Sequence, residues 1–270
     1  THEGQYDNMN AFFRTNGYDE VFSQENYPAD KVVNSFGVQD DFLYDYAIPV
    51  LNQRAATGQP FFATLLSISN HPPYVIPPFF HPKTSEPETQ IVEYADWALR
   101  QFFEEARKQP WFDNTIFVLE GDHGKLVGDA ECELPESYNH IPLMIYSSRI
   151  QPEEKTTFGG QVDIQPTILG LLNIDYLQNN FGVDLLKEER PCMFYTADNM
   201  VVGRNDTLLY LYNYETQQEL TYDIGNGKLN AVPMDDSFLP LKEYSFSMLQ
   251  SAEFLVKHGK TLNSIPFTQQ

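Results

Sequence analysis

The sequence predicts an α/β fold, in which a mostly parallel sheet is flanked by helices and followed by a small antiparallel meander and a closing helix. Two continuous apolar runs, 61–68 and 115–119, have the composition of strands that are covered on both faces. An amphipathic pattern over 90–107 separates them, which predicts a strand-helix-strand unit with a right-handed crossover. Beyond residue 191, short alternating runs replace the long apolar ones.

The other elements follow in chain order. Residues 5–20 are typical of a short helix that leads into a strand. Apolar side chains at three- and four-residue spacing predict a helix over 38–51, and residues 141–147 predict a third strand. A helix is expected over 163–172, where a proline occupies the first turn.

The C-terminal part is expected to form a separate antiparallel subdomain. Its alternating runs, separated by Asp, Asn and Gly, are 192–196, 199–203, 207–213 and 218–223. An amphipathic helix over 241–258 closes the chain. We therefore predict an α/β domain over residues 1–190 and an antiparallel subdomain with its closing helix over 191–270.

Charge and cysteine content exclude several classes of function. Lys and Arg number 17 against 38 Asp and Glu, and the net charge of −21 repels nucleic acid backbones. The same charge opposes docking on an anionic membrane unless a separate anchor holds the protein there. Cys132 and Cys192 show no metal-binding spacing. No apolar run reaches the ~18 residues that span a bilayer.

Candidate ligands follow two of the predicted strands. His71 comes after the strand 61–68, and Asp122 and His123 come directly after 115–119. Ligands of open α/β sheets bind beyond the carboxyl ends of the strands, so we expect these side chains to lie close together. A carboxylate and an imidazole on a glycine-flanked loop suit zinc or manganese. The alternative is a hydrogen-bonded turn without a metal.

The remaining histidines carry weaker signals. His140 precedes the third strand and is a second candidate for substrate binding, although a loop histidine such as His71 or His140 can equally cap backbone groups. His2, His81 and His258 have uninformative neighbours, and we expect them to be structural.

Seven short motifs occur in a distinctive order along the chain. They are YDNM (6–9), NGYD (16–19), SNHPPY (69–74), GDHG (121–124), NHIPL (139–143), GQVDIQPT (160–167) and FGVDLL (181–186). In this order they resemble the lipoteichoic acid synthase and phosphoglycerol transferase branch of the sulfatase-like proteins. The resemblance implies an alkaline-phosphatase-like fold.

The resemblance also implies roles for individual residues. Asp122 and His123 correspond to two ligands of a catalytic divalent metal, for which manganese is expected and zinc, magnesium and calcium are alternatives. His71 corresponds to a histidine that contacts the transferred phosphate. The family's nucleophile is a metal-activated Thr that attacks a phosphodiester and forms a phosphothreonine-type intermediate.

That nucleophilic Thr and a Glu ligand precede the YDNM motif in the family, so we expect them upstream of Thr1 and expect domain 1–190 to lack its N-terminal part. Two ligands alone hold a metal weakly, and the isolated chain is expected to be inactive. An uncovered sheet face is expected to favour self-association.

The resemblance implies a metal-dependent phosphoryl-group transferase of the phosphoglycerol type, or a phosphodiester hydrolase. Its substrate would be a phospholipid headgroup or a phosphorylated or sulfated glycan, with no nucleic acid partner. The intact protein is expected on the extracytoplasmic, periplasmic or cell-envelope side, and membrane contact only through preceding helices. A sulfatase and a non-catalytic binding or assembly module are the alternatives.

Overall fold

The computed structural model describes residues 2–126, 128–225 and 227–261 and divides into two compact units. The first comprises Thr1–Val118 and Ile145–Ile150, and the second Leu119–Met144 and Gln151–Gln270. The domain boundary expected after residue 190 falls inside the second unit, shortly before its five-stranded sheet begins. Among the described residues, no helix is both long and apolar enough to cross a membrane.

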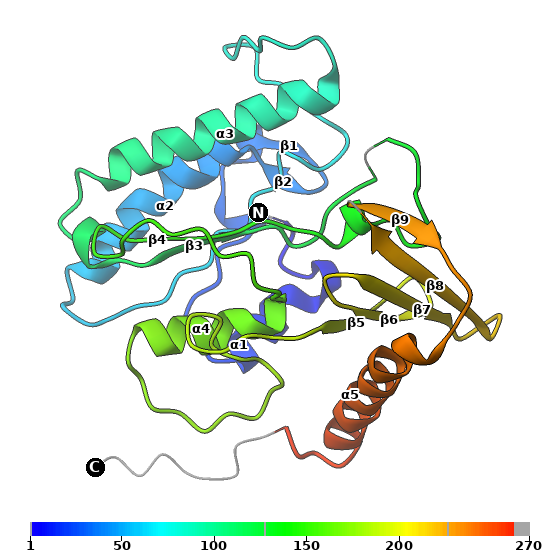
Figure 1. Ribbon diagram of the computed structural model, residues 1–270. Coiled ribbons are helices and arrows are strands. Elements are labelled where there is room, and N and C mark those ends of the chain that lie inside the picture. Colours follow the sequence, from blue (N-terminus) through cyan, green and yellow to red (C-terminus); the bar gives the residue numbers. More distant parts are fainter. Residues whose placement is uncertain (1, 127, 226, 262–270) are drawn as a thin grey trace. The chain divides into compact units, whose positions relative to one another are not determined.

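Two packed helices form the body of the first unit. Its helices are η1 (Tyr6–Asn8), α1 (Met9–Thr15), η2 (Gln24–Asn26), η3 (Ala29–Lys31), α2 (Asp40–Ala55), α3 (Pro87–Ala106) and η4 (Phe112–Asn114), and the short strands β1 (Val32–Asn34) and β2 (Gly37–Val38) pair antiparallel. The long helices α2 and α3 lie side by side (Figure 1). Both confirm helices expected from apolar spacing.

The apolar spacing of α3 predicts that Val92, Ala95 and Leu99 face the core, whereas the structure buries the residues one position earlier in the chain. The buried positions are Ile91, Tyr94, Ala98, Phe102 and Ala106, whereas Val92 is 52% exposed. Tyr94 faces inward because its hydroxyl donates a hydrogen bond of 2.6 Å to Asp41 of α2. A buried tyrosine needs such a partner for its hydroxyl, and this one sets the rotation of the helix.

The strand expected over 61–68 is not formed. None of these residues pairs in any sheet of the described chain, and most of them are exposed, with Phe62 at 74%. The strand-helix-strand unit is therefore wrong in its first member. A continuous apolar run indicates which side chains avoid water, whereas a strand also requires regular pairing in a sheet, and these residues belong to no sheet of the described chain. The strand expected after the first helix is also absent from the described residues before Val32.

The strands expected near 115–119 and 141–147 are confirmed as β3 (Phe117–Glu120) and β4 (Leu143–Tyr146), which pair in a two-stranded sheet. The Gly121 N–H donates to the Pro142 carbonyl at 3.4 Å, so the end of β3 lies beside the beginning of β4. On β4, Leu143 is 37% exposed and Met144 55%. These side chains leave apolar surface uncovered, and self-association through it stays a prediction.

The second unit is built on an antiparallel sheet in the order β5-β6-β7-β8-β9. The strands are β5 (Met193–Ala197), β6 (Met200–Arg204), β7 (Leu208–Asn213), β8 (Gln218–Gly225) and β9 (Lys228–Ala231), and the helices η5 (Glu136–Tyr138), η6 (Gln161–Asp163), α4 (Ile164–Leu171), η7 (Asp236–Phe238) and α5 (Leu239–Lys257). The expected meander and both expected helices are confirmed, whereas β9 was not anticipated.

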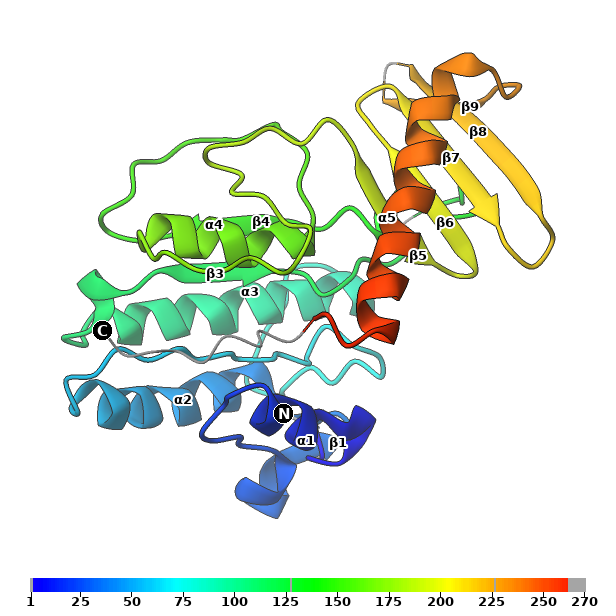
Figure 2. The same cartoon turned by 90° about the horizontal axis from the view of Figure 1, so that it is seen from below.

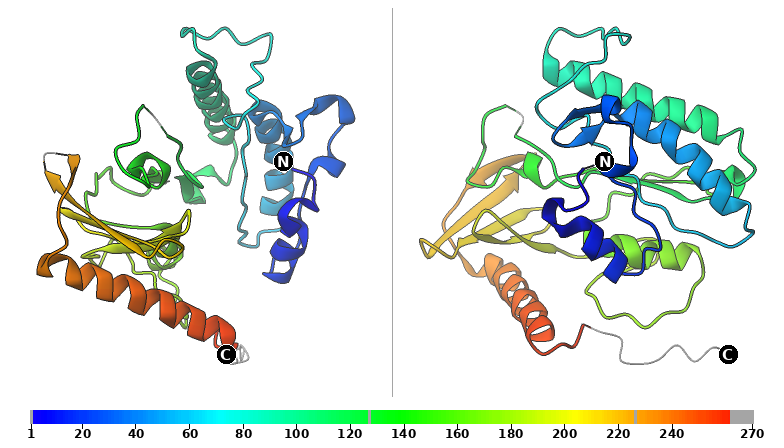
Figure 3. Two further views of the ribbon diagram at one scale, coloured as in Figure 1. Left: turned by 90° about the vertical axis from the view of Figure 1, so that its right-hand side faces the viewer. Right: turned by 180° about the vertical axis from the view of Figure 1, so that it is seen from behind.

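Both faces of this sheet are covered. Helix α5 lies across one face (Figures 2 and 3), where Tyr210, Phe238 and Leu241 form a buried cluster. On the opposite face Leu134 packs against Val202 and its neighbours. Leu134 belongs to the chain between β3 and β4, so the sheet also holds the segment that follows the GDHG motif.

Candidate functional site

The GDHG motif forms a tight loop directly after β3. The Asp122 carboxylate accepts a hydrogen bond of 2.9 Å through Oδ1 from the His123 backbone N–H. The His123 ring nitrogen Nδ1 lies 2.7 Å from the Gly124 carbonyl oxygen. Because a carbonyl only accepts, Nδ1 carries the proton and donates it, which leaves the lone pair of Nε2 free for a ligand.

The two free ligand atoms of this loop point to the same region. Asp122 Oδ2 and His123 Nε2 are 3.8 Å apart, and the side chains are 74% and 68% exposed. An ion about 2.1 Å from each atom can therefore contact both, since such ligand atoms lie at most about 4.2 Å apart. Oxygen and imidazole nitrogen also match the donor set of manganese and zinc.

The described residues contain no group of three or more His, Cys, Asp or Glu side chains placed to hold a metal. Asp122 and His123 are therefore a candidate ligand pair, to which the described residues add no third side chain of these types. The chemistry and spacing of the pair fit a divalent ion, whereas the number of ligands fits only weak binding.

The chain before β4 packs against this loop. The Gly124 N–H donates to the Tyr138 carbonyl at 2.8 Å, and a Cβ on Gly124 would lie 1.9 Å from the Ser137 carbonyl oxygen. Only glycine fits this approach. The predicted site residue His140 lies in the same segment, exposed, between this contact and the Gly121 to Pro142 hydrogen bond.

The loop that carries His71 is held by the N-terminus of α2. Asp40 is 2% exposed, and its Oδ1 accepts hydrogen bonds of 3.0 Å from the N–H groups of Ile68 and Ser69. Burial raises the pKa of Asp40, and these hydrogen bonds oppose the rise. The His71 Nδ1 donates to the Pro72 carbonyl at 2.7 Å, so Nε2 of this exposed imidazole is free as well.

A second imidazole lies near His71. The ring of Phe36 is 3.9 Å from that of His71 and 5.3 Å from that of His2, between ring centroids. Burial is the largest cause that lowers the pKa of His2, and repulsion from a protonated His71 acts in the same direction. The expectation that His2 is structural stays a prediction, and the cluster itself could not be predicted because residues 2, 36 and 71 have no common motif in the sequence.

The relation between the two loops stays a prediction. His71 belongs to the first unit, and Asp122, His123 and His140 belong to the second. The structure defines each loop within its own unit.

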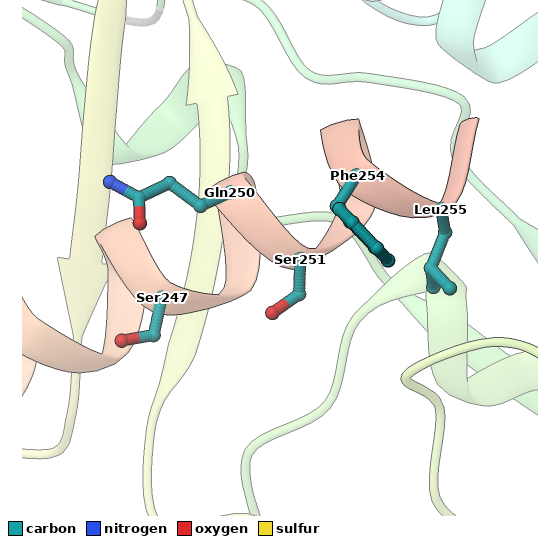
Figure 4. Close-up of a pocket in the computed structure, with 5 residues that line it drawn as sticks. All are labelled: Ser247, Gln250, Ser251, Phe254 and Leu255. Carbon is teal, nitrogen blue, oxygen red and sulfur yellow. The ribbon is translucent and has the colours of Figure 1, made fainter. Parts of the chain in front are cut away.

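A hollow elsewhere in the second unit lies on α5. It is lined by Ser247, Gln250, Ser251, Phe254 and Leu255 (Figure 4). None of these side chains titrates near neutral pH or is a usual ligand of divalent metals, so the hollow does not resemble the predicted metal site.

The fold and the loop geometry together define an α/β protein with an Asp-His pair suited to a divalent metal. A family model described as sulfatase matches residues 1–174, and the chain belongs to the sulfatase family. Lipoteichoic acid synthase 1 of Bacillus subtilis is 27% identical over 243 residues, which cover 82% of this chain and 36% of that protein. The lipoteichoic acid synthase of Staphylococcus saprophyticus is 26% identical over 208 residues, 67% of this chain and 31% of that protein. The chain thus spans about a third of the length of these relatives.

Solved structures confirm the expected alkaline-phosphatase fold. A Vibrio parahaemolyticus protein of the alkaline phosphatase superfamily superposes with a TM-score of 0.81 and 27% identity, covering 93% of this chain and 64% of that one. The lipoteichoic acid synthase LtaP of Listeria monocytogenes superposes with a TM-score of 0.79 and 22% identity, covering 100% of this chain and 70% of that one.

Proposed function

We propose that this chain is part of a metal-dependent phosphoryl-group transferase of the phosphoglycerol type, or of a phosphodiester hydrolase. One observation carries the proposal: Asp122 and His123 present a free carboxylate oxygen and a free imidazole nitrogen 3.8 Å apart on an exposed loop. Membership of the sulfatase family, and similarity to proteins named lipoteichoic acid synthases, support phosphoryl transfer as the reaction class.

Asp122 and His123 would hold the divalent metal, for which manganese is our first choice and zinc, magnesium or calcium the alternatives. A metal bound there supplies a Lewis acid for the phosphoryl oxygens. The role of the Gly124 carbonyl is to keep His123 in the tautomer that offers Nε2, and the His123 N–H aims the carboxylate of Asp122.

His71 would bind the anionic phosphoryl group with Nε2 protonated, donating a hydrogen bond to a phosphoryl oxygen while Nδ1 keeps its bond to the Pro72 carbonyl. His140 is the second candidate for substrate binding. His2 joins this group in our proposal, since its ring and that of His71 both approach Phe36. Two neighbouring imidazoles repel each other when both are protonated, and a bound anion relieves this repulsion.

We propose a phospholipid headgroup or a phosphorylated glycan as the substrate, on the extracytoplasmic side of the membrane. Within the described residues, no third His, Cys, Asp or Glu side chain joins Asp122 and His123 as a possible ligand, and two protein ligands hold a divalent metal weakly. The purified chain should therefore bind manganese weakly and should not turn over a phosphodiester. Phosphodiesterase activity that Asp122→Ala abolishes would contradict this part of the proposal.

Manganese binding tests the ligand assignment directly. Titration of the chain with Mn²⁺, followed by the electron paramagnetic resonance signal of the free ion, should reveal a weak site that Asp122→Ala removes. Asp129→Ala is the matched control, because Asp129 is an exposed carboxylate of the same connection between β3 and β4. Equal Mn²⁺ binding by wild type and Asp122→Ala would remove the basis of the metal assignment.

A sulfatase remains a second candidate, supported by the description of the matching family model. Phosphate and sulfate esters differ in charge, and the site would discriminate between them through its cationic groups. Competition between phosphodiester and sulfate ester substrates, measured on the intact enzyme, distinguishes the two reactions.

A further inference from the structure

A glutamine side chain outside the Asp122 loop donates hydrogen bonds to its backbone. The side-chain amide of Gln161 donates hydrogen bonds to the carbonyl of Gly121 at 3.3 Å and to the carbonyl of Asp122 at 2.8 Å. All three residues belong to the second unit. From this geometry we propose that Gln161 is a positioning residue, which fixes the backbone of the loop so that Asp122 and His123 present their ligand atoms together; the metal-binding part rests on the proposed function.

The other contacts of the ligand pair are local. Asp122 Oδ1 accepts from the adjacent His123 N–H, and His123 Nδ1 donates to the adjacent Gly124 carbonyl. These bonds fix each side chain relative to its own backbone, but they do not fix that backbone in space. Gln161 holds the peptide groups before His123, and the Tyr138 carbonyl holds the N–H of Gly124. The ligand pair therefore lies between two external attachments.

The backbone of Gln161 belongs to a turn that is anchored by the buried side chain of Asp163. Two residues later, Asp163 is completely buried and forms two hydrogen bonds with Arg190, at 3.0 and 2.5 Å. Its carboxylate also accepts from the N–H groups of Gly160 at 2.9 Å and Val183 at 2.8 Å. A side chain that extends from such an anchored turn can restrain a loop, because its own backbone does not follow the movement of the loop.

Hydrogen exchange tests the restraint without any metal. In Gln161→Ala, the amides of residues 121–124 should exchange about fivefold faster or more, because two hydrogen bonds to the loop are lost. Gln161→Glu keeps the volume but places a carboxylate against two carbonyl oxygens, and it should show the same effect. Gln165→Ala is the matched control: Gln165 is also exposed, and its side chain accepts from Asn180 instead.

Manganese affinity tests the consequence for the ligands. Gln161→Ala and Gln161→Glu should raise the Kd for Mn²⁺ about tenfold, as loss of residues that orient metal ligands commonly does. Gln165→Ala should leave Kd unchanged, and the urea midpoint of all three variants should stay near that of wild type. An effect on Kd without a change in global stability supports positioning.

The outcomes separate the two proposals. If Gln161→Ala exchanges and binds Mn²⁺ like wild type while Asp122→Ala loses binding, the positioning role is refuted and the metal site stands. If neither wild type nor Asp122→Ala binds Mn²⁺, the metal assignment fails, and the exchange rates of residues 121–124 alone decide whether Gln161 restrains the loop.

Discussion

Replacing Asp163 by alanine should be among the most destabilising changes in the second unit. The side chains of Asp163 and Arg190 are 0% and 3% exposed, and Arg190 also donates to the Phe181 carbonyl at 2.7 Å and to the Tyr244 hydroxyl at 3.1 Å. Asp163→Ala leaves the guanidinium buried without its counter-charge. Removing one partner of such a pair costs about 3–5 kcal/mol.

This loss is large compared with the stability of a typical domain. A domain is stable by about 5–15 kcal/mol, so Asp163→Ala should remove a third or more of the free energy of unfolding in most of that range. For a urea slope of roughly 2 kcal/mol per molar, a loss of about 4 kcal/mol lowers the midpoint by about 2 M. Urea-induced unfolding followed by far-ultraviolet circular dichroism measures the shift.

Glu253→Ala provides the control for a charge pair at the surface. Glu253 and Lys257 are 3.0 Å apart on α5, and their side chains are 56% and 69% exposed. Solvent screening limits the contribution of such a pair to at most about 0.5 kcal/mol. A midpoint for Asp163→Ala that falls no further than that of Glu253→Ala would refute the argument from burial.

Two further changes test local packing and ionisation. Gly124→Ala should weaken Mn²⁺ binding about tenfold, because the added Cβ would lie 1.9 Å from the Ser137 carbonyl oxygen. Gly121→Ala is the control and should bind Mn²⁺ nearly as wild type does, because its Cβ meets no atom closer than 3.4 Å. Equal affinities of the two variants in a Mn²⁺ titration would contradict the steric argument. Burial raises the pKa of Tyr27 from 10.0 to about 12, so its contribution to stability is present below pH 10 and is lost as the pH rises through about 12. Urea midpoints between pH 9 and 12 should therefore fall less steeply for Tyr27→Phe than for wild type, and parallel curves would speak against this assignment.

Helices with a regular apolar pattern could be predicted from the sequence, because the pattern and the buried face arise from the same side chains. This holds for α2, α3 and α5. The rotation of α3 could not be predicted, since it depends on the hydrogen bond from the Tyr94 hydroxyl to Asp41, 53 residues away in the chain. Hydrophobicity alone places Val92 inside, where the structure exposes it.

Strands were predicted less well than helices because a strand depends on a partner. The runs near 115–119 and 141–147 pair with each other and form β3 and β4, whereas the run 61–68 joins no sheet among the described residues. The backbone hydrogen bonds of a helix lie within one segment, but those of a sheet join two. A local pattern therefore indicates a helix more completely than it indicates a strand.

The candidate site shows the same distinction between local and distant contacts. Asp122 and His123 could be recognised because the ligand pair, its flanking glycines and the preceding strand are adjacent in the sequence. Gln161 could not be recognised as their support, since the hydrogen bonds that reveal it join residues 39 and 40 positions apart. The approach of His2 and Phe36 to His71 could not be predicted for the same reason.

In both candidate loops, the histidine ring is oriented by the same kind of local hydrogen bond. In His71 and in His123, Nδ1 lies 2.7 Å from the carbonyl oxygen of the following residue. Each carbonyl fixes a proton on Nδ1 and leaves Nε2 as the nitrogen that faces a ligand. Because this hydrogen bond joins neighbouring residues, it depends only on the conformation of each loop. The short segments that carry the motifs therefore determine which ring nitrogen faces a ligand. The orientation of those segments depends on distant residues such as Asp40 and Gln161.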